Sequence, residues 1–226
     1  MLNDDRTLVV FGAGGHGKAV AEIATKAGWS VAGFVDDNPA DKENRHDSTH
    51  IFGDRQWLLR SMPPGWRVAL GVGDNRARKA ISEFLYANKI GLATIVSGHA
   101  VVSISSEIGA GTVIMPGVVV NAEVMVGAGA ILNTSSVIEH DVRVGAFAHI
   151  GPHATLGGGA QAGELTFVGM GAAVLPAIRI GRRCLLGALS LATSDVPDDV
   201  TAYGVPARIQ ALRVVSRQTT VAYNRA

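Results

Sequence analysis

One histidine near the middle of the chain lies between two acidic residues, in the sequence Glu139-His140-Asp141. Imidazole is the side chain that changes its protonation nearest neutral pH, and a neighbouring carboxylate favours its protonated form. A histidine in this setting is suited to take a proton from an attacking group. An isolated surface histidine is more often inert, so the interpretation of His140 depends on its surroundings.

A glycine-rich loop, Gly12-Ala13-Gly14-Gly15-His16-Gly17, is the second group with possible chemistry. Three of its glycines fit the dinucleotide-binding pattern, and Asp36 follows Gly17 by about twenty residues. Glycines let backbone N–H groups approach an anion, and the start of the next helix favours negative charge. The loop therefore predicts a binding site for nucleotide phosphates. A purely structural turn is the alternative.

Alternating strand and helix patterns surround this loop. We expect strands over Leu8–Phe11, Ser30–Val35 and Arg67–Val72, and helices over Lys18–Ala27 and Asn75–Lys89. This order predicts a small parallel α/β sheet. The segment is too short to supply the second mononucleotide-binding half of a dinucleotide fold, which disfavours NAD as the ligand.

From Ile90 onward the chain follows a repeat of six residues. Every sixth residue from Val102 to Leu186 is a large aliphatic except Ala162, and mostly small residues stand four places later. A helix would need a period of 3.6 and a flat amphipathic strand a period of 2. A period of six indicates short strands and tight turns wound as a solenoid, expected over residues 102–192 in about five coils. Cys184 lies on the small-residue series and is expected in the core.

The repeat resembles that of the hexapeptide-repeat acyltransferases, whose solenoid is a left-handed parallel β-helix. The left hand follows from this resemblance, because parallel crossovers are normally right-handed. The glycine loop, the repeats and the segment Ile131–Asp141 together resemble sugar O- and N-acyltransferases of the sialic-acid O-acetyltransferase type. UDP-4-amino-sugar (bacillosamine pathway) and GDP-perosamine N-acetyltransferases are the most similar members. We predict a Rossmann-like domain over residues 1–92 and a left-handed β-helix domain with a C-terminal tail over 93–226.

The resemblance implies an acetyl-CoA-dependent N-acetyltransferase. Its acceptor would be the 4-amino group of a nucleotide-linked amino-deoxy sugar, a UDP-4-amino-4,6-dideoxy sugar or GDP-perosamine. The position matching His140 is the family's general base, and the position matching Asp141 tunes that base. The amine would attack the thioester directly, without a covalent enzyme intermediate. Acetylation of a sugar hydroxyl, as on sialic acid, is the alternative.

The resemblance also assigns binding residues and an assembly. The family is trimeric and holds acetyl-CoA between subunits, so His140 of one prism and His149 of a neighbour would share a site. The position matching His149 contacts acetyl-CoA, and those matching Met170 and Ala188 line the same groove. Asn133 matches a position beside the substrate. The positions that bind the sugar nucleotide match Gly14, Gly15, His16, Asp36, Asp37 and Gly73.

A zinc lyase is the rival enzyme class, because carbonic anhydrases use the same solenoid with three histidines at a subunit interface. Zinc ligands must converge about 2 Å from the metal. His149 and His153 are close in sequence, but His99 lies three coils away, about 14 Å at the usual strand spacing. We therefore expect no metal site. A non-enzymatic sugar-nucleotide sensor is a further alternative.

Composition restricts the cellular setting. The formal net charge of +1 gives no electrostatic reason to expect binding to nucleic acid or to an anionic membrane. A single cysteine excludes an internal disulfide and fits a reducing compartment. The N-terminal residues lack an apolar signal segment, and residues 144–163 are too interrupted by glycines to span a membrane. We expect a cytoplasmic homotrimer.

Overall fold

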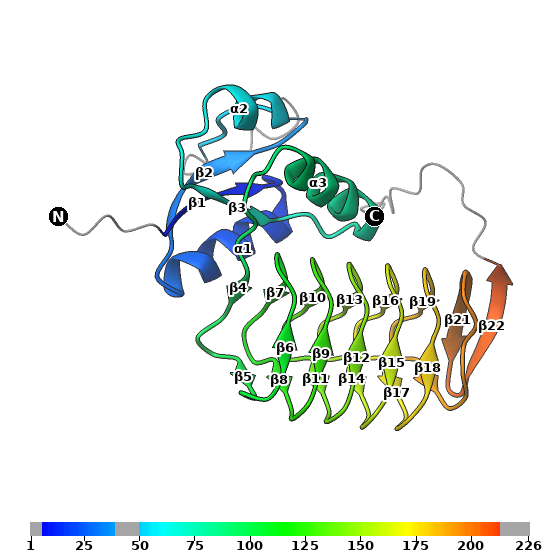
Figure 1. The fold of residues 1–226 in the computed structure, drawn as a ribbon. Coiled ribbons are helices and arrows are strands. Elements are labelled where there is room, and N and C mark those ends of the chain that lie inside the picture. Colours follow the sequence, from blue (N-terminus) through cyan, green and yellow to red (C-terminus); the bar gives the residue numbers. More distant parts are fainter. Residues whose placement is uncertain (1–5, 39–49, 213–226) are drawn as a thin grey trace, which may run out of the picture.

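The structure, a computed structural model, describes residues 6–38 and 50–212 and contains two domains. A small α/β domain lies over one side of a parallel β-solenoid, and the two are joined by the chain after α3 (Figure 1). In these residues no helix is long and apolar enough to cross a membrane.

The α/β domain has a three-stranded parallel sheet in the order β2-β1-β3. Phe11 pairs with Val35 and with Leu70, so all three strands end at one edge, beside the glycine loop. The predicted strands are present. A short helix that the sequence pattern did not predict, α2, begins where the Asp54 side chain accepts a hydrogen bond from the Gln56 N–H. The elements are β1 (Thr7–Phe11), α1 (Gly15–Lys26), β2 (Ser30–Val35), α2 (Arg55–Arg60), β3 (Arg67–Leu70) and α3 (Asn75–Ala87).

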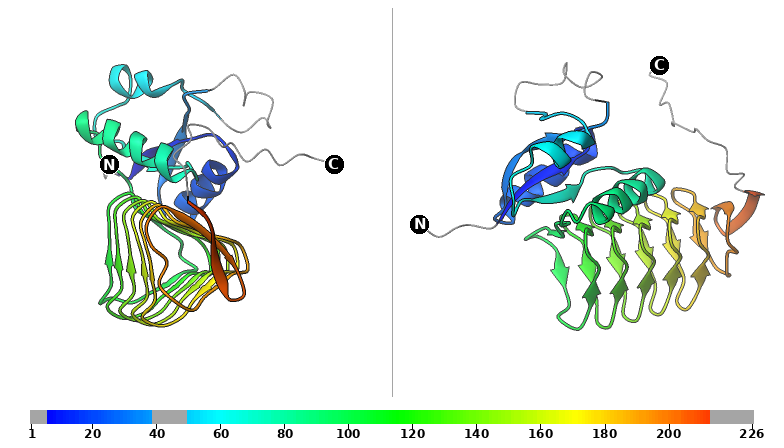
Figure 2. Two further views of the ribbon diagram at one scale, coloured as in Figure 1. Left: turned by 90° about the vertical axis from the view of Figure 1, so that its right-hand side faces the viewer. Right: turned by 45° about the horizontal axis from the view of Figure 1, so that its top comes forward.

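The solenoid is a triangular prism whose three faces are parallel sheets (Figure 2). The first sheet contains β4 (Ile95–Val96), β7 (Val113–Ile114), β10 (Ile131–Leu132), β13 (His149–Ile150), β16 (Phe167–Val168), β19 (Leu185–Leu186), β21 (Val200–Gly204) and β22 (Ala207–Leu212). The second contains β5 (Val101–Val102), β8 (Val119–Val120), β11 (Val137–Ile138), β14 (Thr155–Leu156), β17 (Ala173–Val174) and β20 (Leu191–Ala192). The third contains β6 (Glu107–Ile108), β9 (Met125–Val126), β12 (Arg143–Val144), β15 (Gln161–Ala162) and β18 (Arg179–Ile180).

The solenoid is longer than the sequence repeat indicated. The second sheet has six strands and the first begins at Ile95, so the prism makes about six turns, where the repeat predicted about five from Val102. The additional rung was missed because Ile95 and Val96 precede the regular series. At the other end β21 and β22 pair antiparallel and cover the last parallel rung.

The period of six has a direct structural cause. Each strand from β4 to β20 is two residues long. The aliphatic residue at its second position points into the core, and every member of the series from Ile114 to Leu186 is buried. Three residues later the backbone enters the left-handed region, as at Asp141 with φ of 61° and His153 with φ of 56°. This conformation reverses the chain at each corner of the prism. One strand and one such corner together require six residues.

A column of glycines lets neighbouring coils approach closely at the corner between the third and first sheets. Gly109, Gly127, Gly145, Gly163 and Gly181 occupy equivalent places one coil apart. A Cβ at Gly163 would lie 2.6 Å from the backbone nitrogen of Arg182 on the next coil. Larger residues there would force the coils apart and break the hydrogen bonds between them.

We predict that Gly163→Ala destabilises the solenoid by about 1–3 kcal/mol, the usual cost of overpacking. Gly98→Ala is the matched control, because a Cβ at Gly98 meets no atom within 4 Å and its φ is not in the left-handed region. Chemical denaturation of both variants measures the difference. Equal stabilities would show that the column does not set the coil spacing.

Candidate active site

His140 lies at the corner between the second and third sheets, in the turn from β11 to β12. Its side chain is 65% exposed, and its Nδ1 is 2.8 Å from Oδ2 of Asp141. An ionised carboxylate only accepts hydrogen bonds, so Nδ1 carries the hydrogen when the imidazole is neutral. This leaves the lone pair of Nε2 free to accept a proton. Asp141 is therefore positioned to fix the tautomer that a base requires.

Two neighbours complete the surroundings of His140. Glu139 accepts a hydrogen bond of 2.7 Å from the Asn121 amide on the preceding coil, so its carboxylate is held away from the imidazole. On the following coil, a Cβ at Gly158 would lie 2.6 Å from the His140 Nε2. The absence of a side chain at Gly158 leaves the space that the ring occupies. Sequence spacing alone did not distinguish the two acidic neighbours or reveal the role of Gly158.

The glycine loop of the α/β domain is held by Asp36. The Asp36 carboxylate is buried and accepts hydrogen bonds from the Ala13 N–H at 2.8 Å and the Asn38 N–H at 3.0 Å. Asp37 instead forms an ion pair with Arg55 on α2. Asp36 thus shapes the loop, a structural role that accompanies the predicted contact with the nucleotide.

The predicted binding glycines face open space. A Cβ placed on Gly14, Gly15 or Gly73 would meet no atom of residues 6–38 and 50–212 within 4 Å. Gly14 is the N-cap of α1 and, lacking a side chain, supplies no side-chain cap to this end of the helix. The first N–H groups of α1 are therefore presented at the carboxyl edge of the sheet, where an anionic group of a ligand is favoured.

The two domains meet at a pair of histidines, of which His149 is buried and His16 is half-buried. His16 of the glycine loop and His149 of β13 have ring centroids 6.4 Å apart. His149 Nε2 lies 3.0 Å from the Asn133 amide nitrogen, and the Phe167 ring packs edge-on against it. The other nitrogen of His149, Nδ1, and the His16 Nε2 are buried and have no hydrogen-bond partner among the residues that the structure describes. The fold thus brings predicted residues from both domains into one place.

Burial determines the charge of this pair. Loss of hydration lowers the pKa of His149 to about 3, and the charges of Arg78 and His16 lower it as well, against an opposing effect of the Gly73 backbone. Burial and the Arg78 charge lower the pKa of His16 to about 4. Both imidazoles are neutral at physiological pH, so each can donate through one nitrogen and accept through the other.

Within one subunit the predicted residues occupy three separate places. The histidine pair lies against the first sheet, whereas His140 lies at the corner between the other two sheets. Met170 and Ala188 are exposed in the turns after β16 and β19, at the corner between the first and second sheets. A single chain therefore does not gather the predicted residues at one place.

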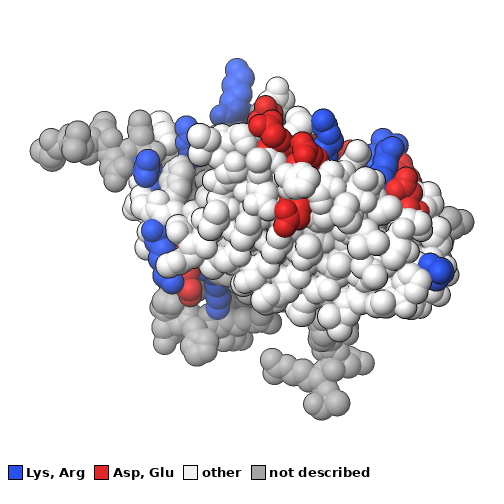
Figure 3. Space-filling view, turned by 90° about the horizontal axis from the view of Figure 1, so that it is seen from below, with Lys and Arg blue, Asp and Glu red and all other residues white. Residues whose placement is uncertain are grey.

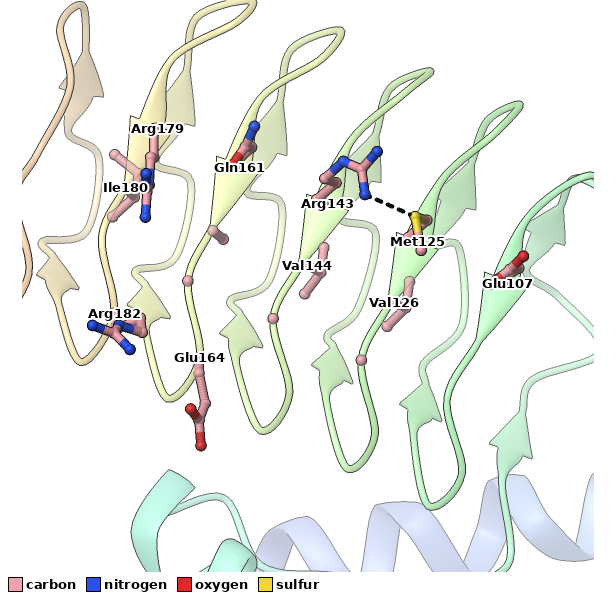
Figure 4. A pocket seen from close by; sticks show the side chains of 14 residues that line it. Glu107, Met125, Val126, Arg143, Val144, Gln161, Glu164, Arg179, Ile180 and Arg182 are labelled. Atoms are coloured by element: carbon pink, nitrogen blue, oxygen red, sulfur yellow. Dashed lines mark hydrogen bonds between the residues drawn. The ribbon is translucent and has the colours of Figure 1, made fainter.

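A groove of about 410 Å³ runs along the outer face of the third sheet (Figure 4). Arg143, Gln161 and Arg179 project from its strands, and the Arg143 Nη1 lies 3.0 Å from the Met125 sulfur. The predicted site residues are not among those that line it. In the described part of the chain, no group of three His, Cys, Asp or Glu side chains is arranged to hold a metal ion.

Comparison with known proteins identifies the family. Residues 7–85 match the PglD N-terminal domain. PerB from Caulobacter crescentus, solved in complex with CoA and GDP-perosamine, is 38% identical with a TM-score of 0.84, over 91% of this chain and 97% of PerB. The chain belongs to the hexapeptide-repeat sugar acyltransferases. The predicted fold, a Rossmann-like domain followed by a left-handed parallel β-helix, is thereby confirmed.

Two further relatives of this sugar acyltransferase support the assignment. The acetyltransferase domain of PglB from Neisseria gonorrhoeae FA1090 is 34% identical with a TM-score of 0.83, over 91% of this chain and 100% of that domain. A galactoside O-acetyltransferase of Lactococcus lactis subsp. lactis (strain IL1403) is 46% identical over 44 residues, 20% of this chain. The chain spans only about a fifth, 21%, of that curated relative.

We predict that acid destabilises this sugar acyltransferase through the histidine pair. The pKa of His149 is lowered from 6.5 to about 3 and that of His16 to about 4. As the pH falls below 6.5, the unfolded chain binds protons before the folded one, so their contribution to the free energy of unfolding is lost progressively. His149 accounts for up to about 1.4 kcal/mol per pH unit between pH 6 and 4.

Denaturation at pH 7 and pH 5 measures this loss. His149→Gln should reduce the dependence of stability on pH, and His99→Gln, which changes an exposed histidine, should not. A pH dependence that is unchanged in His149→Gln would contradict a neutral, buried imidazole at this position.

Proposed function

We propose that this protein transfers an acetyl group from acetyl-CoA to the amino group of a nucleotide-linked amino-deoxy sugar. The observation that carries the proposal is the likeness over nearly the whole chain to PerB, which was solved with CoA and GDP-perosamine bound. The PglB domain, which has been solved with acetyl-CoA, supports the same acyl donor. A UDP-linked 4-amino-4,6-dideoxy sugar and GDP-perosamine are the two proposed acceptors.

His140 is the proposed general base. The sugar amine must attack as the uncharged form, its ammonium proton having gone to solvent, and its nitrogen must lose one further proton as the bond to the thioester carbonyl forms. His140 Nε2 is free for this step because Asp141 holds Nδ1 at 2.8 Å. Asp141 also stabilises the imidazolium that forms when the proton arrives. The CoA thiolate then leaves and takes up a proton, which the imidazolium is placed to return, so no covalent enzyme intermediate is needed.

We propose that each active site is shared by two subunits of a trimer. The outward residues of the second sheet carry no charge and form a face of Val101, Val119, Val137, Thr155, Ala173 and Leu191. Figure 3 views the molecule from below, and most of the solenoid surface in that view is free of charged side chains. His140 lies along one edge of this face, and Met170 and Ala188 lie along the other. Packing through this face about a three-fold axis joins the two edges from neighbouring copies.

The proposed binding roles come from the resemblance to the family. Gly14, Gly15, His16, Asp36, Asp37 and Gly73 form the proposed site for the sugar nucleotide, with Asn133 beside the sugar. His149, Met170 and Ala188 are the proposed contacts for acetyl-CoA. The closeness of His16 and His149, at 6.4 Å between ring centroids, supports adjacent binding sites for the two substrates.

The relative that acetylates a galactoside oxygen makes a hydroxyl acceptor the second candidate. Purified protein incubated with acetyl-CoA and either UDP- or GDP-linked amino sugars, or with sialic acid and galactosides, distinguishes the two through thiol release. Turnover only with hydroxyl acceptors would replace the proposed N-acetylation. Absence of turnover with every acceptor would contradict the acyltransferase assignment itself.

We predict that His140→Ala lowers kcat by about a hundredfold to ten-thousandfold, the usual contribution of a general base. The fold should be retained, because this side chain is exposed outside the prism core. Asp141→Asn should give a smaller loss, since the imidazole keeps its place but loses a stabilising charge. Steady-state kinetics measure both effects. Near-full activity of His140→Ala on a hydroxyl acceptor between pH 6 and 8 would remove His140 from the mechanism.

We also predict that two inactive variants restore activity when their subunits mix. Gly14→Val should damage the nucleotide site and His140→Ala the base, but a mixed trimer contains some sites in which both parts are intact. Unfolding and refolding the two variants together, followed by an activity assay, tests this. Lack of recovery in mixed trimers, or a monomer in sedimentation of the native protein, would place each site within one chain.

A further inference from the structure

Arg78 on α3 is fully buried and has no role in the function proposed above. Its Nε donates to the Gly129 carbonyl at 2.7 Å, and its Nη2 donates to the Phe147 carbonyl at 2.8 Å. Its Nη1 donates to the carbonyls of Val72 and Gly73 at 3.1 and 3.0 Å. These acceptors are neutral backbone oxygens that belong to three separate segments of the chain.

Two of the three segments adjoin His149, because Phe147 precedes it by two residues and the Gly73 backbone acts on its imidazole. Val72 and Gly73 form the loop after β3, Gly129 lies in the turn before β10, and Phe147 lies in the turn before His149 on β13. The guanidinium therefore links the nucleotide-binding domain to two consecutive coils of the solenoid. Its planar fork can satisfy several carbonyls at fixed angles, which neither lysine nor an apolar side chain can do.

A buried charge of this kind is costly, and apolar residues would join two domains more cheaply. Burial lowers the pKa of Arg78 to about 10, against an opposing effect of Asp74, so the guanidinium remains charged at neutral pH. The hydrogen bonds described for Arg78 end on carbonyl or amide oxygens and none on a carboxylate. The positive charge is therefore left to act on its neighbours, and it opposes protonation of His16 and His149.

We infer that Arg78 is a positioning residue, which holds the Gly73 loop, His16 and His149 in the one arrangement that binds the nucleotide of the substrate. This inference rests on the proposed function only for the identity of that ligand. Arg78 itself need not touch the substrate. It acts by holding the loop and both imidazoles in place before the ligand arrives, so that binding does not have to order them.

Four substitutions separate the charge of Arg78 from its hydrogen bonds. Arg78→Met removes both, and Arg78→Lys keeps a charge but loses the fork. Asn75→Asp is nearly isosteric and places a carboxylate where the Asn75 Oδ1 now accepts from Arg78 Nη2 at 2.9 Å. It also removes the hydrogen bonds that Asn75 Nδ2 donates to the carbonyls of Leu165 and Thr166. Arg76→Met is the matched control, because Arg76 is exposed on the same helix.

The first measurement follows the two imidazoles by NMR during a pH titration of the protein without ligand. Arg78→Met and Asn75→Asp should raise the pH at which His16 and His149 take up protons, since they remove or offset the nearby positive charge. Arg78→Lys should raise it less, and Arg76→Met should leave it unchanged. The order among the variants separates the effect of the Arg78 charge on the two imidazoles from the effect of its hydrogen bonds.

The second measurement is calorimetric binding of UDP and of GDP. The nucleotide that the native protein binds more tightly should bind about tenfold more weakly to Arg78→Met and to Arg78→Lys than to the native protein. A tenfold loss corresponds to about 1.4 kcal/mol of binding free energy, here the loss of preorganisation. Arg76→Met should bind as the native protein does. If the native protein binds neither nucleotide, the proposed substrate is wrong, and the imidazole titration still tests Arg78.

The inference is overturned if folded Arg78→Met and Arg78→Lys bind the nucleotide as the native protein does. It is equally overturned if His16 and His149 titrate identically in Arg78→Met and Arg76→Met. If Arg78→Met does not fold, the imidazole titration and the nucleotide-binding measurement are made on Arg78→Lys and the nearly isosteric Asn75→Asp, and they test the inference in the same way.

Discussion

Backbone hydrogen bonding between successive coils is the interaction on which the remaining structure depends. Each coil donates to the next, as from the Gly145 N–H to the Ala162 carbonyl at 2.7 Å and from the Gly163 N–H to the Ile180 carbonyl at 2.9 Å. Coils can approach this closely only where side chains are absent or point inward. The glycine column and the buried aliphatic series both meet that requirement, and they make the positions of outward-facing residues repeat from coil to coil.

Functional side chains can be placed at the corners of the prism without disturbing the regular packing of the coils. Where a corner residue in the left-handed region is exposed, its side chain lies outside the core and its identity is not fixed by core packing. Asp141 occupies such a place with φ of 61°, and aspartate tolerates this conformation better than most residues. The same residue therefore turns the chain and contacts His140. Function is added here without disturbing the packing that supports it.

The sequence was sufficient to predict the solenoid because its signal is local and repeated. The spacing of aliphatic residues predicted the inward positions, and the glycine loop predicted the first helix and its neighbouring strands. The short helix α2 was missed because six residues carry too little periodicity. Handedness, by contrast, came from resemblance, because the period of six is the same for either hand.

The candidate site was less predictable from the sequence because it depends on how the two domains meet. His16 and His149 are far apart in the chain, and nothing in their spacing indicates that their rings lie 6.4 Å apart. The sequence contains one indication that Arg78 is unusual, which is its position on the buried face of α3 with Ile81 and Leu85. An arginine at such a position has to find acceptors, yet the carbonyls that it uses belong to distant turns. Only the folded chain brings them together.

The stacking of the coils also fixes the distances between equivalent residues along each corner of the prism. Pro152, Met170 and Ala188 stand one coil apart along the same corner, so consecutive members are separated by about 4.8 Å. The length of any groove built along that corner can change only by adding or removing a whole coil. Relatives with more or fewer coils would therefore differ in reach by discrete steps, whereas point substitutions alter only the lining at a given step.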